Sequence, residues 1–267
     1  VRENYIKDNL MIFVNSIIVN PSFDSQTKET LTTTRSKFGS TCPISDSFID
    51  SLAKTGIMDK AIALDQFKSS IGLKRTDGKK TKNILDIPKL EDAKWAGTKK
   101  SELCTLILTE GDSAKAMAVA GISVLPDGRN TYGIFPLRGK LLNVRDKLDK
   151  DIVINQEITN IKRIFGLKEG KDYRNVDELR YGKLLIMTDQ DVDGSHIKGL
   201  LINFLCRWPS LTKINGFITS LLTPIVKVKR NRTIRQFYTL TDYEAWKHSN
   251  NGGKGWTIKY YKGLGTS

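Results

Sequence analysis

The sequence is poor in cysteine. Its 267 residues include three cysteines, at positions 42, 104 and 206. The number is odd, the positions are widely scattered, and no two of them form a Cys-x-x-Cys pair. This pattern argues against a disulfide framework and against a structural zinc site, and it fits a protein of a reducing compartment.

Long apolar runs are also missing. No stretch approaches the ~18 consecutive apolar residues that indicate a membrane-spanning helix. The first residues, VRENYIKDN, lack a starting Met and show no signal-peptide pattern. The last residues, YYKGLGTS, follow directly on a strand-like run. We therefore expect both ends to be cut from a longer, intracellular protein that has no membrane partner.

Positive charge is what the sequence has in excess. Lys and Arg total 43 against 29 Asp and Glu, for a formal net charge of +14. Such a balance indicates a polyanionic partner, with nucleic acid first and an acidic membrane surface second. A basic protein that is merely soluble is the competing interpretation, and charge alone does not decide between them.

The first part of the chain predicts one strand, one helix and a loop. Residues 11–19 (MIFVNSIIV) are apolar on both alternating faces, which predicts a buried strand. Between residues 44 and 70, apolar side chains recur at nearly helical spacing, which predicts a helix. The basic, turn-rich stretch 73–83 (LKRTDGKKTKN) has no apolar period, and we interpret it as an exposed loop that divides the chain.

After that loop, predicted strands and helices alternate. Strands are expected at 103–108, 132–137 and 183–187, and helices at 113–122, 155–165 and 195–208. Alternation of this kind is typical of a parallel α/β sheet with flanking helices, and fully apolar strands fit burial on both faces. The remainder, from residue 217 onward, is predicted to be rich in β-structure, with one short helix near 241–248.

Acidic residues follow two of the predicted strands. Glu110 ends the first strand, and Asp189, Asp191 and Asp193 follow the third. Ligands of open α/β sheets bind outside the carboxyl ends of the strands, so the two turns should meet at one crevice. Crowded carboxylates need a counter-charge, and Mg²⁺ suits a few carboxylates together with waters and a phosphate oxygen. The sequence therefore predicts a magnesium site.

Three other interpretations of the acidic turns compete with the metal site. The turns could be solvated loops, or the carboxylates could only cap the helices that follow. The string Asp-x-Asp-x-Asp-Gly also opens a calcium-binding EF-hand loop. That interpretation fails because the twelfth position is Leu200 instead of Glu, and because a strand precedes the motif.

Basic residues lie beside the acidic turns. Arg138, Lys140 and Arg145 follow the predicted strand 132–137, and His196 with Lys198 begins the helix after the acidic motif. Cations next to a carboxylate–metal centre suit a phosphodiester substrate, because they can hold neighbouring phosphates. A solvated basic loop, and a capping or core role for His196, remain alternatives.

Together these motifs resemble a known family. EGDSA, PLRGK, DxDxDGSHIKG and YYKGLGTS closely resemble eukaryotic-type (type IIA) DNA topoisomerase II, and NPSFDSQTKE resembles the motif that ends the transducer domain of that family. The resemblance implies a TOPRIM fold, a Rossmann-like parallel sheet with flanking helices. It divides the chain into the end of an α+β transducer domain with its linker (1–90), the TOPRIM metal-binding domain (100–220) and a β-rich extension (221–267).

The resemblance also implies roles for individual residues. It implies that Glu110, Asp189 and Asp191 bind the metal, with two Mg²⁺ expected per site. Asp193 is expected to support this catalytic cluster. The residues expected to bind DNA are Arg138, Lys140, Asn143, His196 and Lys262. Those expected to contact ATP are Gln26 and Lys28.

The resemblance further implies the setting in which the chain works. The whole enzyme is expected to be an ATP-hydrolysing homodimer that acts on double-stranded DNA in the nucleus, a nucleoid or a viral factory. Its tyrosine nucleophile and nucleotide pocket lie outside this chain, so the fragment alone is expected to be inactive. Two alternatives remain: another TOPRIM enzyme, such as a nuclease or primase, and a DNA-binding module whose acidic centre is purely structural.

Overall fold

The computed structural model describes residues 1–261, 263 and 264. It divides the chain into two compact units, Val1–Ser70 and Ile71–Ser267. Among the described residues, no helix has the length and apolar character needed to span a bilayer.

The first unit is mainly helical near its end. It contains α1 (Glu3–Lys7), η1 (Arg35–Lys37), α2 (Asp46–Leu52), a π-helical turn η2 (Ala53–Ile57) and the start of α3 (Met58–Arg75). The Ser45 hydroxyl accepts a hydrogen bond from the Phe48 amide at 3.3 Å and so caps α2. The helix predicted for 44–70 is confirmed, but Gly56, with φ of 83°, interrupts it.

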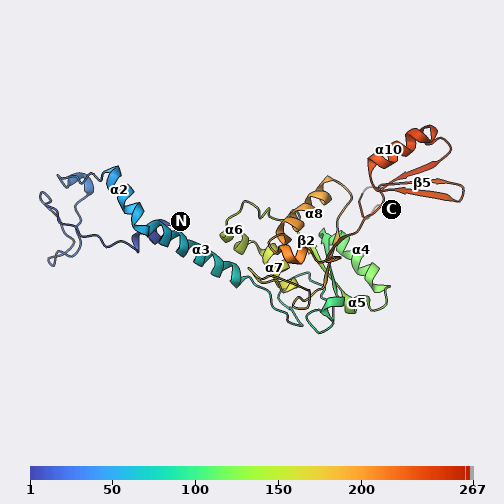
Figure 1. The fold of residues 1–267 in the computed structure, drawn as a ribbon, viewed down its shortest axis with the longest axis horizontal. Coiled ribbons are helices and arrows are strands. Elements are labelled where there is room, and N and C mark those ends of the chain that lie inside the picture. Colours follow the sequence, from blue (N-terminus) through green and yellow to red (C-terminus); the bar gives the residue numbers. More distant parts are fainter. Residues whose placement is uncertain (262, 265–267) are drawn as a thin grey trace. The chain divides into compact units, whose positions relative to one another are not determined.

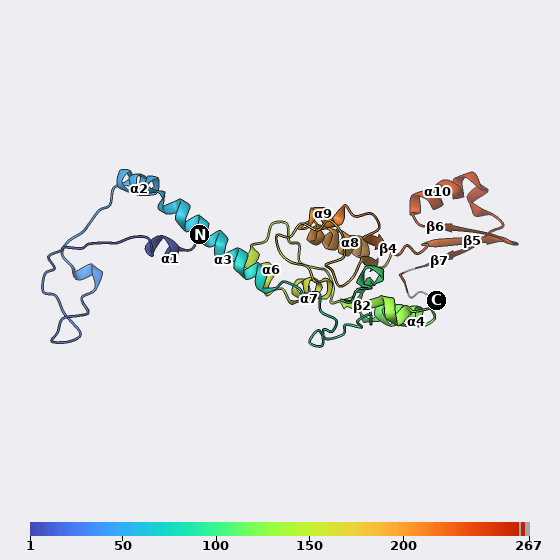
Figure 2. The same cartoon turned by 60° about the horizontal axis from the view of Figure 1, so that its bottom comes forward.

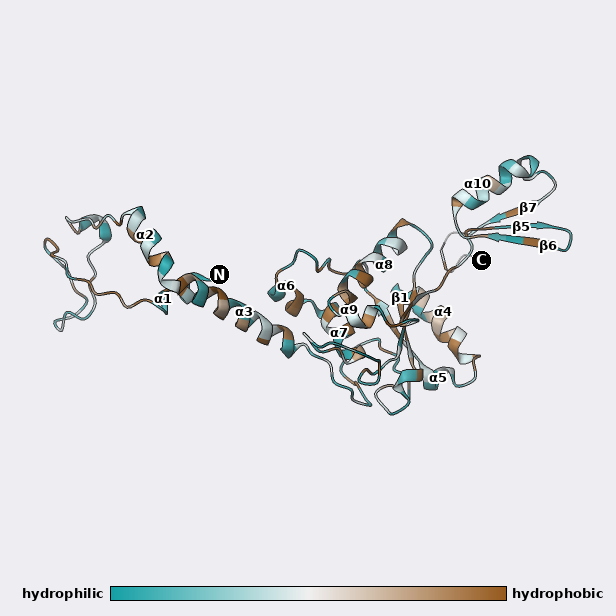
Figure 3. Ribbon diagram, in the orientation of Figure 1, coloured by the Kyte–Doolittle hydropathy of each residue, from teal (hydrophilic) through white to brown (hydrophobic). Residues whose placement is uncertain are grey.

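The buried strand predicted for residues 11–19 is wrong. The segment forms no helix or strand, and Phe13 and Ile17 are each 87% exposed. Figure 3 shows it as brown coil. A strand needs a neighbouring strand to accept its backbone hydrogen bonds, and a lone extended segment is not stable in water. Among the described residues of this unit, the one β-bridge is Phe23 with Leu31, which leaves residues 11–19 without a partner strand.

The second unit is built on a parallel sheet, as predicted, and its strand order is β2-β1-β3-β4 (Figure 1). Its strands are β1 (Thr105–Glu110), β2 (Tyr132–Leu137), β3 (Lys183–Met187) and β4 (Ile218–Ser220). The apolar composition of β1, β2 and β3 reflects burial on both faces, whereas the short β4 is partly exposed. On β1, Leu106 and Leu108 join the larger core cluster, whereas Ile107 between them joins a second one.

Helices cover both faces of this sheet (Figures 1 and 2). The larger cluster includes residues of α7 (Gln156–Phe165) and α8 (Val192–Leu205), and the second includes residues of α4 (Gly111–Ser123). These three helices are those that periodicity predicted, with ends shifted by a few residues. The shorter η3 (Ser101–Leu103), α5 (Gly128–Thr131), α6 (Asp149–Ile154) and α9 (Pro209–Thr212) went unpredicted, since two turns or fewer carry no readable period.

The basic segment 73–83 is less exposed than predicted. Helix α3 continues to Arg75, and the side chains of Leu73 and Thr76 are buried. The buried ammonium of Lys162 donates to the Leu73 carbonyl at 3.1 Å and to the Thr76 hydroxyl at 2.9 Å. Asp77 and Glu169 pair with the same ammonium at 3.1 and 3.2 Å. A buried ammonium requires such a set of acceptors, so the segment is held against α7.

A second buried cation fixes the segment that precedes β1. The Arg180 guanidinium is fully buried and pairs with Asp92, whose other oxygen accepts a hydrogen bond from the Tyr181 hydroxyl at 2.5 Å. Arg180 also donates to the Thr81 carbonyl at 2.7 Å and to the Ile164 carbonyl at 2.9 Å.

The C-terminal part forms a small antiparallel sheet of order β6-β5-β7. The strands are β5 (Val226–Arg230), β6 (Thr233–Phe237) and β7 (Thr257–Tyr260). Helix α10 (Leu240–Ser249) and the turn η4 (Asn251–Gly253) lie between β6 and β7 in the chain. The predicted β-rich region with one short helix is confirmed.

The Asp92–Arg180 pair yields a stability prediction. Replacing Asp92 by Ala leaves a buried guanidinium without its counter-charge, and we expect the free energy of unfolding to fall by ~3–5 kcal/mol. Urea denaturation of the purified chain measures this. The matched control is Asp146→Ala, which removes an exposed carboxylate and should change stability by less than ~0.5 kcal/mol. Equal effects of the two substitutions would show that the pair does not stabilise the fold.

Candidate functional site

Strand pairing brings Glu110 next to Asp189. In the parallel register of β1 with β3, Thr109 lies opposite Met187, so both carboxylates follow at the same edge of the sheet. The Asp189 amide donates a hydrogen bond to Oε2 of Glu110 at 3.1 Å. The two acidic turns therefore meet at the carboxyl ends of their strands.

The chain returns to Asp189 near its end. Oδ1 of Asp189 accepts a hydrogen bond from the Leu264 amide at 2.6 Å. A Cβ atom on Gly263 would lie 2.7 Å from Oδ2 of Asp189, so a residue with a side chain could not approach this closely. Lys262, expected to contact DNA, lies outside the described residues.

Asp191 is the N-cap of helix α8. Its Oδ1 accepts a hydrogen bond from the Gly194 amide at 2.8 Å. Gly194 also permits a close approach of the helix to the strand end, because a Cβ there would lie 2.0 Å from the Asp189 carbonyl oxygen. Asp191 therefore does cap the helix that follows it, as the alternative interpretation of the acidic turns predicts. The cap uses one of its two carboxylate oxygens.

Asp193 points to a basic partner. Its Oδ1 pairs with the Lys140 ammonium at 2.7 Å, which links the acidic turn to the basic loop after β2. Hydrogen bonding and charge attraction from Lys140 lower the pKa of Asp193, and exposed His196 adds a smaller lowering. Glu110 differs: burial raises its pKa, as do the charges of Asp189, Asp191 and Asp193, although the hydrogen bond from the Asp189 amide opposes them.

These residues fit a magnesium ion held mainly by water and substrate. Within residues 1–261, 263 and 264, no three His, Cys, Asp or Glu side chains converge closely enough to enclose a metal by themselves. Mg²⁺ is commonly bound through one or two carboxylates, several waters and a phosphate oxygen, so Glu110 and Asp189 are a sufficient protein contribution. Burial, and after it the charges of three neighbouring carboxylates, raise the pKa of Glu110, as expected for a carboxyl without a cationic partner.

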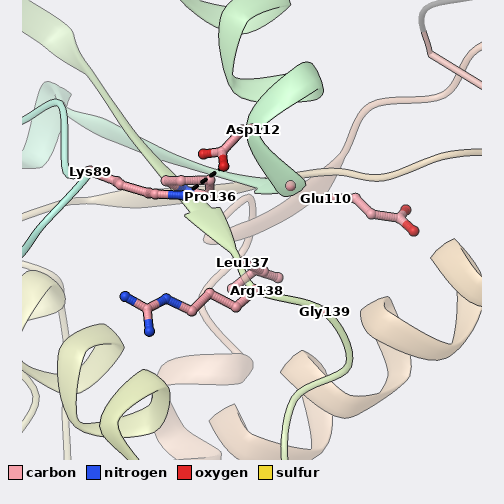
Figure 4. Close-up of a pocket in the computed structure, with 8 residues that line it drawn as sticks. Lys89, Glu110, Asp112, Pro136, Leu137, Arg138 and Gly139 are labelled. Carbon is pink, nitrogen blue, oxygen red and sulfur yellow. Dashed lines mark hydrogen bonds and ion pairs between the residues drawn. The ribbon is translucent and has the colours of Figure 1, made fainter.

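The basic loop after β2 has its own positioning contacts. The Arg138 amide donates to Oε1 of Glu157 at 2.7 Å, and Asn143 accepts a hydrogen bond from Asn203 of α8 at 2.7 Å. In Figure 4 the Arg138 side chain points away from Glu110. Arg138, Lys140 and Asn143 are all exposed. Only Lys140 among them forms an ion pair with one of the acidic residues in the described structure.

An open pocket of about 370 Å³ lies beside Glu110 (Figure 4). The ends of β1 and β2 line it, together with Lys89, which pairs with Asp112 of α4 at 2.5 Å. The motifs of the sequence do not indicate Lys89 or Glu157. Lys89 is distant in sequence from every motif, and its segment is held at the sheet by the antiparallel bridge of Glu91 with Ile134 and by the hydrogen bond from Lys115 to the Lys89 carbonyl at 2.8 Å. Asp112 lies two residues after Glu110 in the EGDSA motif, so the sequence does indicate it.

Gln26 and Lys28 lie in the first unit, in a tight turn. The Lys28 amide donates to the Ser25 carbonyl at 3.1 Å, and Lys28 has a positive φ of 57°. Both side chains are exposed. A non-glycine residue in this region is uncommon and is worth a functional hypothesis.

Comparison with known families gives three matches along the chain. Residues 105–221 match the Toprim domain, residues 221–267 match the C-terminal associated domain of TOPRIM, and residues 1–71 match DNA gyrase B. The matches cover both the parallel sheet and the small antiparallel sheet.

Individual relatives are similar over the whole chain. DNA topoisomerase 2 of Pisum sativum is 55% identical over 270 residues, which is 100% of this chain and 18% of that protein. DNA topoisomerase 2 of Acanthamoeba polyphaga mimivirus is 50% identical over 272 residues, 100% of this chain and 21% of its own length. The chain thus spans about a fifth of these relatives.

A solved structure agrees with the fold. The crystal structure of the Plasmodium falciparum topoisomerase II DNA-binding, cleavage and re-ligation domain superposes with a TM-score of 0.64 and 56% sequence identity. The match covers 70% of this chain and 25% of that one.

The raised pKa of Glu110 predicts a pH-dependent effect of substitution. A carboxyl whose pKa is higher in the folded state favours folding at low pH, and this contribution is lost as pH rises through the folded pKa. Glu110→Gln removes the ionised form, so in EDTA the variant should melt above the wild type at neutral pH. The difference should vanish below the ordinary Glu pKa of ~4.3.

Melting curves of the purified chain across pH provide the measurement. Glu102→Gln, which neutralises an exposed carboxylate in the same unit, is the control and should leave the melting temperature nearly unchanged. A Glu110→Gln variant that melts at or below the wild type at neutral pH would show that burial and neighbouring charge do not destabilise the ionised form of Glu110.

Proposed function

Because the chain belongs to the type IIA DNA topoisomerase family, we propose that it carries the metal-binding carboxylates with which the complete enzyme cleaves and rejoins double-stranded DNA. The observation that supports this most strongly is the meeting of Glu110 and Asp189 at the carboxyl ends of β1 and β3. Their geometry is what a Mg²⁺ site shared with a phosphate requires.

Each residue of the site has a part in this proposal. Glu110 and Asp189 would hold one Mg²⁺ near the substrate phosphate, and Asp189 with Asp191 would hold a second. Bound Mg²⁺ supplies Lewis acidity, which stabilises charge that develops on the phosphate and on the departing oxygen. Asp193 orients Lys140 through their 2.7 Å ion pair and so keeps a cation at the edge of the crevice.

The basic residues around the crevice are proposed to hold the DNA backbone. Arg138, Lys140 and Asn143 lie exposed on one loop beside the carboxylates, and His196 follows on α8. Contacts from such side chains to phosphates position a duplex without reading its sequence. Lys262 belongs to the same proposal. The attacking tyrosine is proposed to come from another part of the complete enzyme, so this chain alone neither cleaves DNA nor hydrolyses ATP.

The remaining proposals concern the complete enzyme. We propose that it hydrolyses ATP, with Gln26 and Lys28 contacting the nucleotide, and that it works as a homodimer. Similarity to plant and viral DNA topoisomerase 2 supports a nuclear or viral-factory setting. In Lys28, an exposed ammonium at a strained backbone position is suited to a terminal phosphate.

Substitutions of the carboxylates test the metal proposal. In the complete enzyme, Asp189→Asn should abolish Mg²⁺-dependent cleavage, because Asp189 serves both ions. Asp193→Asn should reduce cleavage by ~10–100-fold, as is typical for residues that support the ligands. Cleavage measured against Mg²⁺ concentration distinguishes the two variants, with a thermal melt to show that both fold. Normal cleavage by Asp189→Asn at low Mg²⁺ would exclude this crevice as the metal site.

Lys28 tests the nucleotide proposal. Lys28→Ala in the complete enzyme should slow ATP-dependent strand passage and leave ATP-independent DNA cleavage nearly intact, since the carboxylates are unaffected. Lys37→Ala, an exposed lysine of the same unit outside the motif, is the control. If both activities of Lys28→Ala fell equally, the motif would be structural in this protein.

A further inference from the structure

The small antiparallel sheet has one covered and one open face. Val226 and Val228 of β5 and Phe237 of β6 pack with Tyr243 and Trp246 of α10 in a separate core cluster. Helix α10 lies along that side of the sheet in both views (Figures 1 and 2). Side chains alternate along a strand, so the residues between the valines project from the opposite face.

The open face carries a cluster of lysines. Lys227 and Lys229 alternate with the buried valines of β5, and Lys259 lies directly opposite Lys227 on β7. The ammonium groups of Lys227 and Lys259 lie over the same Tyr261 ring, at 5.1 and 5.2 Å from its centroid. We call Lys227, Lys229, Lys259 and Tyr261 the lysine face.

No acidic residue balances the lysine face. Within residues 1–261, 263 and 264, none of its three lysines takes part in an ion pair. The hairpin sequence 225–237 (IVKVKRNRTIRQF) has five basic residues and no acidic one. Like charges directly opposite each other on neighbouring strands destabilise a sheet. A polyanion on this face would remove that repulsion.

The chemistry of the face suits phosphates. Its cations are ammonium groups, which act as point charges and can bind phosphate oxygens from many directions. Its aromatic ring is half-buried with two ammonium groups over it, so it offers no clear face for an unstacked base. Backbone phosphates of a duplex suit this arrangement best.

We propose that the lysine face is a DNA-backbone contact of its own, additional to the residues around the carboxylate crevice. It binds the phosphates of a duplex without sequence preference. This inference rests on the proposed function in one respect, that the polyanion is DNA. It does not require a metal at the carboxylates.

The test compares two triple variants of equal net charge. Lys227→Gln, Lys229→Gln and Lys259→Gln together remove the lysine face, and Lys94→Gln, Lys99→Gln and Lys213→Gln together remove three exposed lysines elsewhere. Affinity of the 267-residue chain for a 30-base-pair duplex is measured in EDTA over a range of salt concentrations. EDTA removes any contribution of bound metal.

The first variant should bind at least about tenfold more weakly at low salt. Its slope of log affinity against log salt should be less steep by about 2.7, or ~0.9 for each of three lost phosphate contacts. The control should keep nearly the wild-type slope and affinity. Restoring charge with Lys227→Arg, Lys229→Arg and Lys259→Arg should restore binding. The melting temperature of the first variant should not fall, because a repulsion has been removed.

Several results would overturn the proposal. Equal losses in both Gln variants would mean that net charge alone drives binding. Tighter binding of single-stranded DNA of the same length would mean that bases are recognised, and tighter binding of polyglutamate would indicate an acidic protein partner. Metal-dependent cleavage by the complete enzyme tests the carboxylates separately. Failure of the lysine-face proposal would therefore leave the metal proposal standing, and failure of the metal proposal would leave the lysine face standing.

Discussion

Parallel pairing of β1 with β3 is the constraint on which the site depends. The register sets Thr109 opposite Met187, so Glu110 at the end of β1 lies at the same edge of the sheet as the turn that follows β3 and carries Asp189. Slipping one strand by a single residue would turn its side chains to the other face and separate Glu110 from the Asp189 amide. The buried side chains on both faces of β1 oppose such a slip, since Leu106, Ile107 and Leu108 would all exchange environments.

Two buried cations then hold the polypeptide around this sheet. Lys162 ties the end of α3 and the following turn to α7, and Arg180 ties the segment before β1 to the loop before β3. Both interact mainly with carbonyl groups and acidic residues of segments that have no regular structure. Hydrogen bonds to buried charges therefore replace the hydrophobic packing that helices and strands use. Lys89 reaches the pocket beside Glu110 through a segment fixed in this way.

The sequence predicts the central sheet well because each strand is marked by its own residues. Runs such as 132–137 and 183–187 are apolar on both faces and match β2 and β3 residue for residue. Residues 11–19 carry the same signal and form no strand, because apolar character reports a tendency to be buried and does not supply a partner strand. The burial of part of segment 73–83 was not predicted, because its contacts are polar. Polar residues in a turn-rich stretch ordinarily indicate exposure.

For the candidate site, the sequence predicts which acidic residues share one edge of the sheet, but it does not predict how they divide their roles. Glu110 and Asp189 meet as the strand ends require, and their hydrogen bond is visible only in three dimensions. Capping by Asp191 and the pairing of Asp193 with Lys140 depend on where α8 begins and on how the loop after β2 turns. The contact of Leu264 with Asp189 joins residues 75 positions apart, and no local pattern could indicate it.

The distribution of charge around the crevice explains why one carboxylate, that of Glu110, differs from the rest. Lys140 neutralises Asp193 at the exposed edge, and the α8 amide at Gly194 satisfies one oxygen of Asp191. Glu110 accepts a hydrogen bond from the Asp189 amide, which is neutral. Burial and the charges of neighbouring carboxylates raise the pKa of Glu110. Added positive charge would therefore relieve the most repulsion beside Glu110, which forms no ion pair among the described residues. The Asp189 carboxylate is better compensated, because its Oδ1 accepts a hydrogen bond from the Leu264 amide at 2.6 Å. The ion pair with Asp193 keeps the exposed Lys140 beside the acidic turn, so this lysine compensates Asp193 and leaves Glu110 uncompensated.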